Sequence, residues 1–250
     1  MAEWLDPQKR QARGGVETAG VGTDAGEAVV FDEGLRSHML KVYNYMASGV
    51  LLTGIVAMLF AQTEFAQNLM INGGILSWVI LLSPLAFILA MSFGINRMST
   101  ATLQLCFWAF ATVMGLSMAR IFMMFSGESI AQTFFATAAA FAALSLWGYT
   151  TKKDLSGWGS FLIMGVVGLI IASVANIWFA SGTMHWVISF AGVLIFAGLT
   201  AYDTQRIKRE YYHFRGTETL GKIAIMGALN LYLDFVNMFQ FLLSFMGGSD

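Results

Sequence analysis

Residues 158–180 read WGSFLIMGVVGLIIASVANIWFA and contain no charged side chain. A helix of about 20 apolar residues is long enough to cross the hydrocarbon core of a membrane, which is about 30 Å thick. Six other runs of this kind lie at 43–62, 73–96, 100–125, 130–150, 184–205 and 220–246. The sequence therefore predicts an all-α integral membrane protein with seven transmembrane helices.

Charged residues are few and unevenly placed. They make up 12% of the chain, against 57% for hydrophobic residues, whereas a soluble domain carries about 25% charged residues. Twelve of the 29 formal charges lie in residues 1–42. We expect residues 1–30 to form a disordered cytoplasmic tail, because their small apolar surface cannot offset the entropy lost on ordering. Residues 31–250 should form the transmembrane domain, which the chain enters through a short amphipathic helix over 31–42.

The composition also excludes several kinds of site. A net charge of −1 argues against nucleic acid as a partner, because phosphate binding requires a basic surface. Cys106 is the only cysteine, so neither a disulfide framework nor a cysteine-rich zinc site can form. We expect no cofactor and no enzymatic activity.

The basic residues predict how the chain crosses the membrane. Thirteen of the fourteen Lys and Arg residues fall on one side of the seven predicted spans, and the positive-inside rule makes that side cytoplasmic. The N-terminus is then cytoplasmic, and the C-terminus lies on the opposite side. Arg120, near the outer end of the third span, is the exception. It either extends its charge to the lipid headgroups or pairs with Glu128.

Two acidic residues lie inside apolar runs, Asp203 in the sixth and Asp234 in the seventh. A carboxylate in a membrane span usually faces the bundle interior or an aqueous cavity. A helical hairpin that turns at Gly216 and Thr217 would bring the two carboxylates to a similar depth, given a rise of about 1.5 Å per residue. They either hold helices together by hydrogen bonds or share a functional site, and their matching depth favours the shared site.

Polar residues accompany both acids. Asn230 and Asn237 share a helix face with Asp234, and Thr200 lies one turn before Asp203. This stripe either ties helices together or lines an ion path. Two close carboxylates cannot both ionise cheaply, so they should share a proton and titrate as a unit. When ionised they would form a weak oxygen site for Ca²⁺. Arg97, at the end of the second span, is placed either to neutralise one of them or to anchor the topology.

The residues around both acids resemble the signature of the Bax inhibitor-1 family, also called the transmembrane Bax inhibitor motif family. The resemblance covers about residues 31–246. The two acidic motifs are GLTAYDTQRIK (198–208) and LYLDFVNMF (231–239). Three further segments resemble the bacterial branch of the family: LKVYNYM (40–46), MGLSMARIF (114–122) and GYTTKKDLS (148–156).

The resemblance implies a seven-helix fold with a central last helix, in a bacterial inner membrane with a periplasmic C-terminus. It implies a pH-sensitive calcium leak, with calcium ions and protons as partners, in which Asp203 pairs with Asp234 to form the gate. Arg97 matches the basic residue that latches the closed state of the family. The resemblance also leaves open a non-transporting regulator of a membrane-bound AAA protease.

Other membrane protein classes fit the sequence less well. An intramembrane aspartyl protease also uses two Asp residues on its sixth and seventh helices, and Tyr202-Asp203 matches its first motif. Its second motif, Gly-x-Gly-Asp, is not matched, because Tyr232 and Leu233 precede Asp234. A rhomboid-type serine protease needs a histidine within the bundle, whereas the three histidines lie at or outside the ends of the predicted spans.

Overall fold

The computed structural model describes residues 23–247, with side chains from Glu33 onward except at 70–72. This part of the chain is helical and contains no strand. Seven of its helices are long and apolar enough to span a membrane, which confirms the predicted architecture. The helices are α1 (Thr23–Ala61), α2 (Glu64–Asn72), α3 (Ile75–Gly94), α4 (Thr100–Met124), α5 (Gly127–Thr150), α6 (Ser156–Phe179), α7 (Gly182–Phe214) and α8 (Leu220–Met246).

Three helix boundaries differ from those expected. α1 begins at Thr23, so residues 23–30 of the predicted disordered tail are helical, and residues 1–22 lie outside the described part. Good helix formers such as Ala25, Glu27 and Ala28 account for this early start. α2 was not predicted, and α7 continues well beyond residue 205 to Phe214. Residues 1–37 and 38–250 are separate compact units, and the contacts below belong to the second unit.

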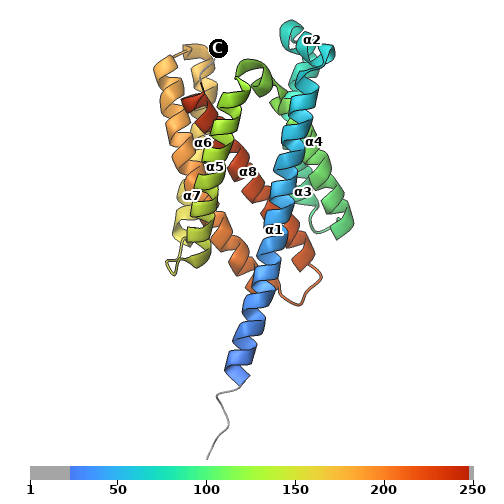
Figure 1. Ribbon diagram of the computed structural model, residues 1–250, viewed down its shortest axis with the longest axis vertical. Coiled ribbons are helices and arrows are strands. Elements are labelled where there is room, and N and C mark those ends of the chain that lie inside the picture. The colour runs from blue at the N-terminus through green and yellow to red at the C-terminus, as the bar shows by residue number, and fades with distance from the viewer. Residues whose placement is uncertain (1–22, 248–250) are drawn as a thin grey trace, which may run out of the picture. The chain divides into compact units, whose positions relative to one another are not determined.

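The last helix, α8, is central in the bundle, as predicted. It packs against α7, α5 and α4, and Figure 1 shows it passing between α5–α7 on one side and α3–α4 on the other. Fourteen of its 27 residues are buried, a larger share than in the other spanning helices. Its Tyr232 hydroxyl shares a hydrogen bond of 2.6 Å with Thr53 of α1, and Thr53 Oγ1 also lies 2.8 Å from the carbonyl oxygen of Ala111 on α4.

Small residues allow the helices to approach closely where α5 crosses α7. A Cβ atom on Gly148 of α5 would lie 2.3 Å from the carbonyl oxygen of Ala201 on α7. No side chain fits at that distance, so the two backbones are in direct contact there. This contact holds α7 in place just before Asp203, which is two residues beyond Ala201.

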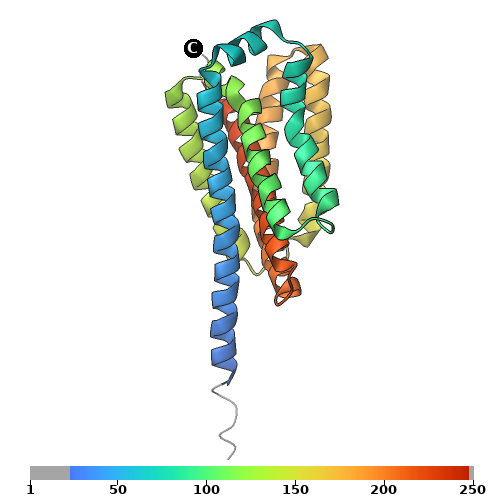
Figure 2. The same cartoon turned by 90° about the vertical axis from the view of Figure 1, so that its right-hand side faces the viewer.

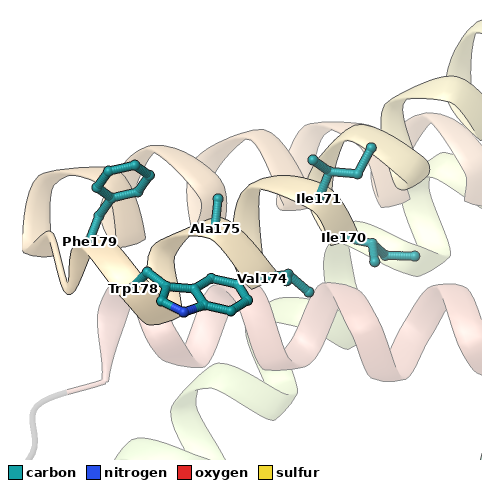
Figure 3. A pocket seen from close by; sticks show the side chains of 6 residues that line it. All are labelled: Ile170, Ile171, Val174, Ala175, Trp178 and Phe179. Atoms are coloured by element: carbon teal, nitrogen blue, oxygen red, sulfur yellow. The ribbon is translucent and has the colours of Figure 1, made fainter.

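The outer surface of the bundle is apolar. α3 and α6 bury few of their side chains. Figure 3 shows a shallow groove on α6 lined by Ile170, Ile171, Val174, Ala175, Trp178 and Phe179. Because these side chains have no polar partner in the bundle, they are suited to lipid tails.

Candidate functional site

The register between α7 and α8 places the two membrane acids. A Cβ on Gly227 of α8 would lie 3.0 Å from Ile207 of α7, and one on Gly192 of α7 would lie 2.5 Å from Phe241 of α8. These two close approaches fix an antiparallel pair in which Asp203 is level with about residue 231. Asp234 is therefore offset by roughly 5 Å along the axis, or one turn. The similar depth expected from the sequence agrees with this register.

Both carboxylates are buried: Asp203 is 6% exposed and Asp234 is 4% exposed. The charges of Asp203 and Arg206 both act on Asp234, so the three groups form one electrostatic cluster. Asp203 Oδ1 and Asp234 Oδ2 have no hydrogen-bond partner among the described residues. Buried carboxylate oxygens are nearly always hydrogen-bonded. Asp203 Oδ1 instead faces the Arg206 guanidinium at 3.2 Å, so Asp234 Oδ2 is the oxygen that is available to a proton or a cation.

Arg206 is the counter-charge of the site. Its Nη1 lies 3.2 Å from Asp203 Oδ1, one helical turn away, and its Nε lies 3.4 Å from Glu210 Oε1. Its guanidinium carbon is 5.9 Å from the centre of the Tyr202 ring. One arginine is thus shared between a buried acid and a half-buried acid on the same helix.

The structure does not bring Arg97, the predicted latch, to the two acids. It is exposed in the turn between α3 and α4, where its backbone N–H donates to the carbonyl of Gly94. That turn lies beside the start of α8: a Cβ on Gly221 would meet Thr100 at 3.2 Å. Asp234 is 13 residues further along α8, which is about 20 Å. The position expected for Arg97 is held by Arg206 in this structure.

Some side chains of the polar stripe donate hydrogen bonds to backbone carbonyls of their own helix. Thr200 is buried and donates to the Phe196 carbonyl at 2.8 Å. Asn237 donates to the Leu233 carbonyl at 2.8 Å. Asn230 and Asn237 are half-buried on the face that carries Asp234. Thr200 and Asn237 keep oxygen acceptors free, so the stripe can bind a donor or a cation beside the acids.

A second polar cluster connects α1, α5 and α7 one residue after Asp203. The Thr204 hydroxyl lies 2.9 Å from Ser145 Oγ, and Ser145 Oγ lies 2.5 Å from the Tyr43 hydroxyl. Thr204 Oγ1 is also 2.8 Å from the Thr200 carbonyl oxygen. The cluster holds the Asp203 segment against two further helices, and it was not predicted from the sequence.

The loop between α5 and α6 is fastened to α7 directly below the acids. Gln205 accepts from the Leu155 N–H and donates to the Lys153 carbonyl, both at 2.8 Å. Arg209 lies 3.0 Å from Asp154 and 2.6 Å from Ser156. Hydrogen bonds from the side chain and backbone of Ser156, with the Arg209 charge, hold the pKa of Asp154 below its usual range. This clamp keeps the lower part of α7 in place.

The two carboxylates and Arg206 offer charge and proton exchange at the site. In the part of the chain that the structure describes, no three His, Cys, Asp or Glu side chains gather into a group that could hold a metal ion. Two carboxylates alone form a weak oxygen site, since Ca²⁺ takes 6–8 oxygen ligands when firmly held. The pair can therefore bind a cation only transiently, with further oxygens from water or the stripe.

The chain is similar to known bacterial membrane proteins over most of its length. An uncharacterized protein of Rickettsia prowazekii (strain Madrid E) is 44% identical over 87% of this chain and 92% of its own length. The inner membrane protein YbhL of Escherichia coli (strain K12) is 39% identical over 86% of this chain and 92% of its own length. The model of the family described as "Inhibitor of apoptosis-promoting Bax1" matches residues 35–250. The predicted resemblance is thus confirmed, and the chain belongs to this Bax inhibitor-1 family of membrane proteins.

Proposed function

We propose that this protein is a pH-sensitive calcium leak in a bacterial inner membrane, and that Asp203 and Asp234 form its gate. The observation that carries the proposal is that two buried carboxylates lie on adjacent helices at a similar depth, and that Arg206 forms an ion pair with one of them, Asp203. Asp234 Oδ2 has no hydrogen-bond partner among the described residues, and Asp203 Oδ1 has only the ion pair with Arg206. A buried cluster of this kind is costly to maintain, and it marks an ion or proton site in membrane proteins more often than a structural one.

Charge balance gives the cluster two neutral states. Two carboxylates and Arg206 leave one negative charge, which a shared proton cancels. Alternatively, Ca²⁺ cancels both carboxylates after Arg206 has withdrawn. Glu210 already contacts Arg206 on the same helix, 3.4 Å from its Nε, so the arginine keeps one ion pair when it leaves Asp203. Protons and Ca²⁺ thus compete for the same two carboxylates.

This competition sets the sign of the pH dependence. At low pH the shared proton holds the pair together by a hydrogen bond and leaves no charge for Ca²⁺. As the pH rises, loss of the proton adds repulsion between the carboxylates, and a cation relieves it. Calcium flux should therefore rise with pH through the titration of the pair.

Reconstitution of the full chain into liposomes tests the proposal. Calcium entry would be followed with a trapped dye across a pH series, for the native chain and for Asp203→Asn and Asp234→Asn. Glu128→Gln is the matched control, because Glu128 lies at the start of α5, at the end of the helix away from Asp203. Its carboxylate accepts a hydrogen bond from Gln132. Each Asp variant should flatten the pH dependence, and the control should keep it. A folded native chain without calcium flux would reject the leak and favour a regulator of a membrane-bound AAA protease.

A further inference from the structure

A second polar site lies at the opposite end of the bundle from the turn between α7 and α8. It is a pocket of about 260 Å³ between the end of α2, the first turns of α3 and the last turns of α4. Its lining includes Leu69, Ser77, Trp78, Leu81, Ser117 and Arg120. It shares no residue with the acidic site.

Arg120 is a cation without a carboxylate partner among the described residues. Its side chain is exposed, and its Nε lies 3.2 Å from the sulfur of Met124. A thioether is a weak acceptor, and the guanidinium has five N–H donors. The predicted alternative partner, Glu128, accepts instead from Gln132 at 3.0 Å. An arginine near the end of a membrane-spanning helix extends its charge to the headgroup region, where an anion can meet it, and the described residues supply no carboxylate there.

Two serines present acceptors to the same pocket. The Ser77 hydroxyl donates to the Leu69 carbonyl at 2.9 Å, and the Ser117 hydroxyl donates to the Met114 carbonyl at 2.8 Å. Each hydroxyl has only one hydrogen to donate, so its oxygen can only accept from a bound molecule. The pocket therefore combines a positive donor with two neutral acceptors.

The depth of the pocket matches that of lipid headgroups. α2 lies across the end of the spanning helices (Figure 2), and Thr63 caps its start by accepting from the Ala66 N–H. It buries Ala66 and Leu69 and leaves Phe65 56% exposed. Trp78, at the start of α3, is 63% exposed. Short helices and tryptophans in these positions are typical of the membrane–water interface.

We propose that this pocket binds the headgroup of an anionic phospholipid of the phosphatidylglycerol type. The phosphate would receive hydrogen bonds from Arg120, and the headgroup hydroxyls would donate to Ser77 and Ser117. The acyl chains would lie against the exposed Trp78 and Leu81 of α3. A free anion does not fit as well, because the remaining walls are apolar. The α6 groove of Figure 3 has only apolar lining residues, so it should accept acyl chains without selecting a headgroup.

Native mass spectrometry of the detergent-purified full chain tests this site. Phosphatidylglycerol or phosphatidylcholine would be titrated against the native chain, Arg120→Gln, Arg120→Lys and Arg97→Gln. Arg97→Gln is the matched control, because it removes an exposed arginine from the other end of the bundle. Phosphatidylglycerol should bind the native chain more tightly than phosphatidylcholine. Arg120→Gln should weaken its binding about tenfold, as expected for lost charge-assisted hydrogen bonds, and Arg120→Lys should restore part of it.

Several results would overturn the proposal. Equal affinities for the two lipids would show that the pocket does not select a headgroup. An equal loss of phosphatidylglycerol affinity in Arg120→Gln and Arg97→Gln would show that Arg120 does not form a specific site. Displacement of phosphatidylglycerol by millimolar inorganic phosphate would identify a free-anion site instead. If Arg120→Gln does not fold, Ser77→Ala serves as the second variant. It should weaken phosphatidylglycerol more than phosphatidylcholine, because only the former has headgroup hydroxyls to donate.

Discussion

Asp203 and Arg206 lie one turn apart on α7 and form an ion pair, with 3.2 Å between Oδ1 and Nη1. The pair joins a buried carboxylate to an arginine whose side chain is 30% exposed. The arginine therefore reaches from the bundle interior toward the edge, where Glu210 also contacts it. In the proposed gate, this geometry makes Arg206 the group that a cation would have to displace from Asp203.

Replacement of Arg206 by Gln should raise the resting calcium leak near neutral pH. A partly exposed ion pair contributes about 1 kcal/mol, so its loss should favour cation entry by about fivefold. Dye-loaded liposomes measure the change. Arg97→Gln is the informative comparison, because the family resemblance assigns the latch to Arg97, whereas the structure places it away from the acids. A larger leak in Arg97→Gln than in Arg206→Gln would return the latch to Arg97 and imply a different closed conformation.

The double variant Asp203→Asn/Asp234→Asn should affect the pH dependence little more than either single variant. The two acids share one proton in the proposed gate, so removing either acid already removes the shared titration. Flux against pH in the same liposomes provides the measurement. Independent and additive effects of the two single variants would reject a shared gate, even if both residues prove important.

The sequence identified the two acids because each interrupts an apolar run, but it missed Arg206 for a physical reason. The apolar run ends at residue 205, and the predicted span ended with it, so Arg206 was assigned to the connection. In the structure α7 continues to Phe214, and the ion pair between Arg206 and Glu210 lies on this continuation. Hydropathy marks where the membrane ends, whereas helix propensity and side-chain pairs decide where the helix ends.

The α2 helix was missed for a similar reason, because nine residues in a short connection are too few for a span. The contacts of Thr204 with Ser145 and of Thr53 with Tyr232 join residues that are far apart in the sequence. Such pairs depend on how the helices pack, which a single sequence does not determine. If the sixth predicted span had been extended beyond residue 205, the spacing of three residues from Asp203 to Arg206 would have placed both on one helix face.

Gly148→Ala should destabilise the bundle. Its Cβ would lie 2.3 Å from the Ala201 carbonyl oxygen, so α5 and α7 must separate, at a cost of about 1–3 kcal/mol for overpacking. Gly168→Ala on α6 is the control, because nothing lies within 4 Å of its Cβ position, and it should be neutral or slightly stabilising. Unfolding in a denaturing detergent series measures both. Equal stability of the two variants would contradict the close contact.

Asp154→Asn should loosen the loop between α5 and α6 without shifting the pH dependence of flux. Because the folded pKa of Asp154 is lowered, its contacts persist above the ordinary pKa of an aspartate. They are lost only when the pH falls through the lowered value. The clamp is therefore intact over the range in which the gate is proposed to work. Faster tryptic cleavage after Lys152 and Lys153 would report the loosening. A shifted flux profile in this variant would make the loop part of the pH sensor.

The basic residues predict that the N-terminus is cytoplasmic and the C-terminus periplasmic. Eight of the fourteen Lys and Arg residues lie in or beside the α3–α4, α5–α6 and α7–α8 connections, and five more precede the first predicted span in the sequence. Seven spans place the termini on opposite sides. Cys106, the only cysteine, would first be replaced, and a single cysteine would then be introduced at Ser129 or at Ser156. Cells with a permeabilised outer membrane would be treated with a maleimide that cannot cross the inner membrane. Ser129→Cys, at the start of α5, should react, whereas Ser156→Cys, at the start of α6, should react only after lysis. The reverse pattern would mean that the protein is inserted in the opposite orientation, with the proposed Asp203–Asp234 gate near the periplasmic side.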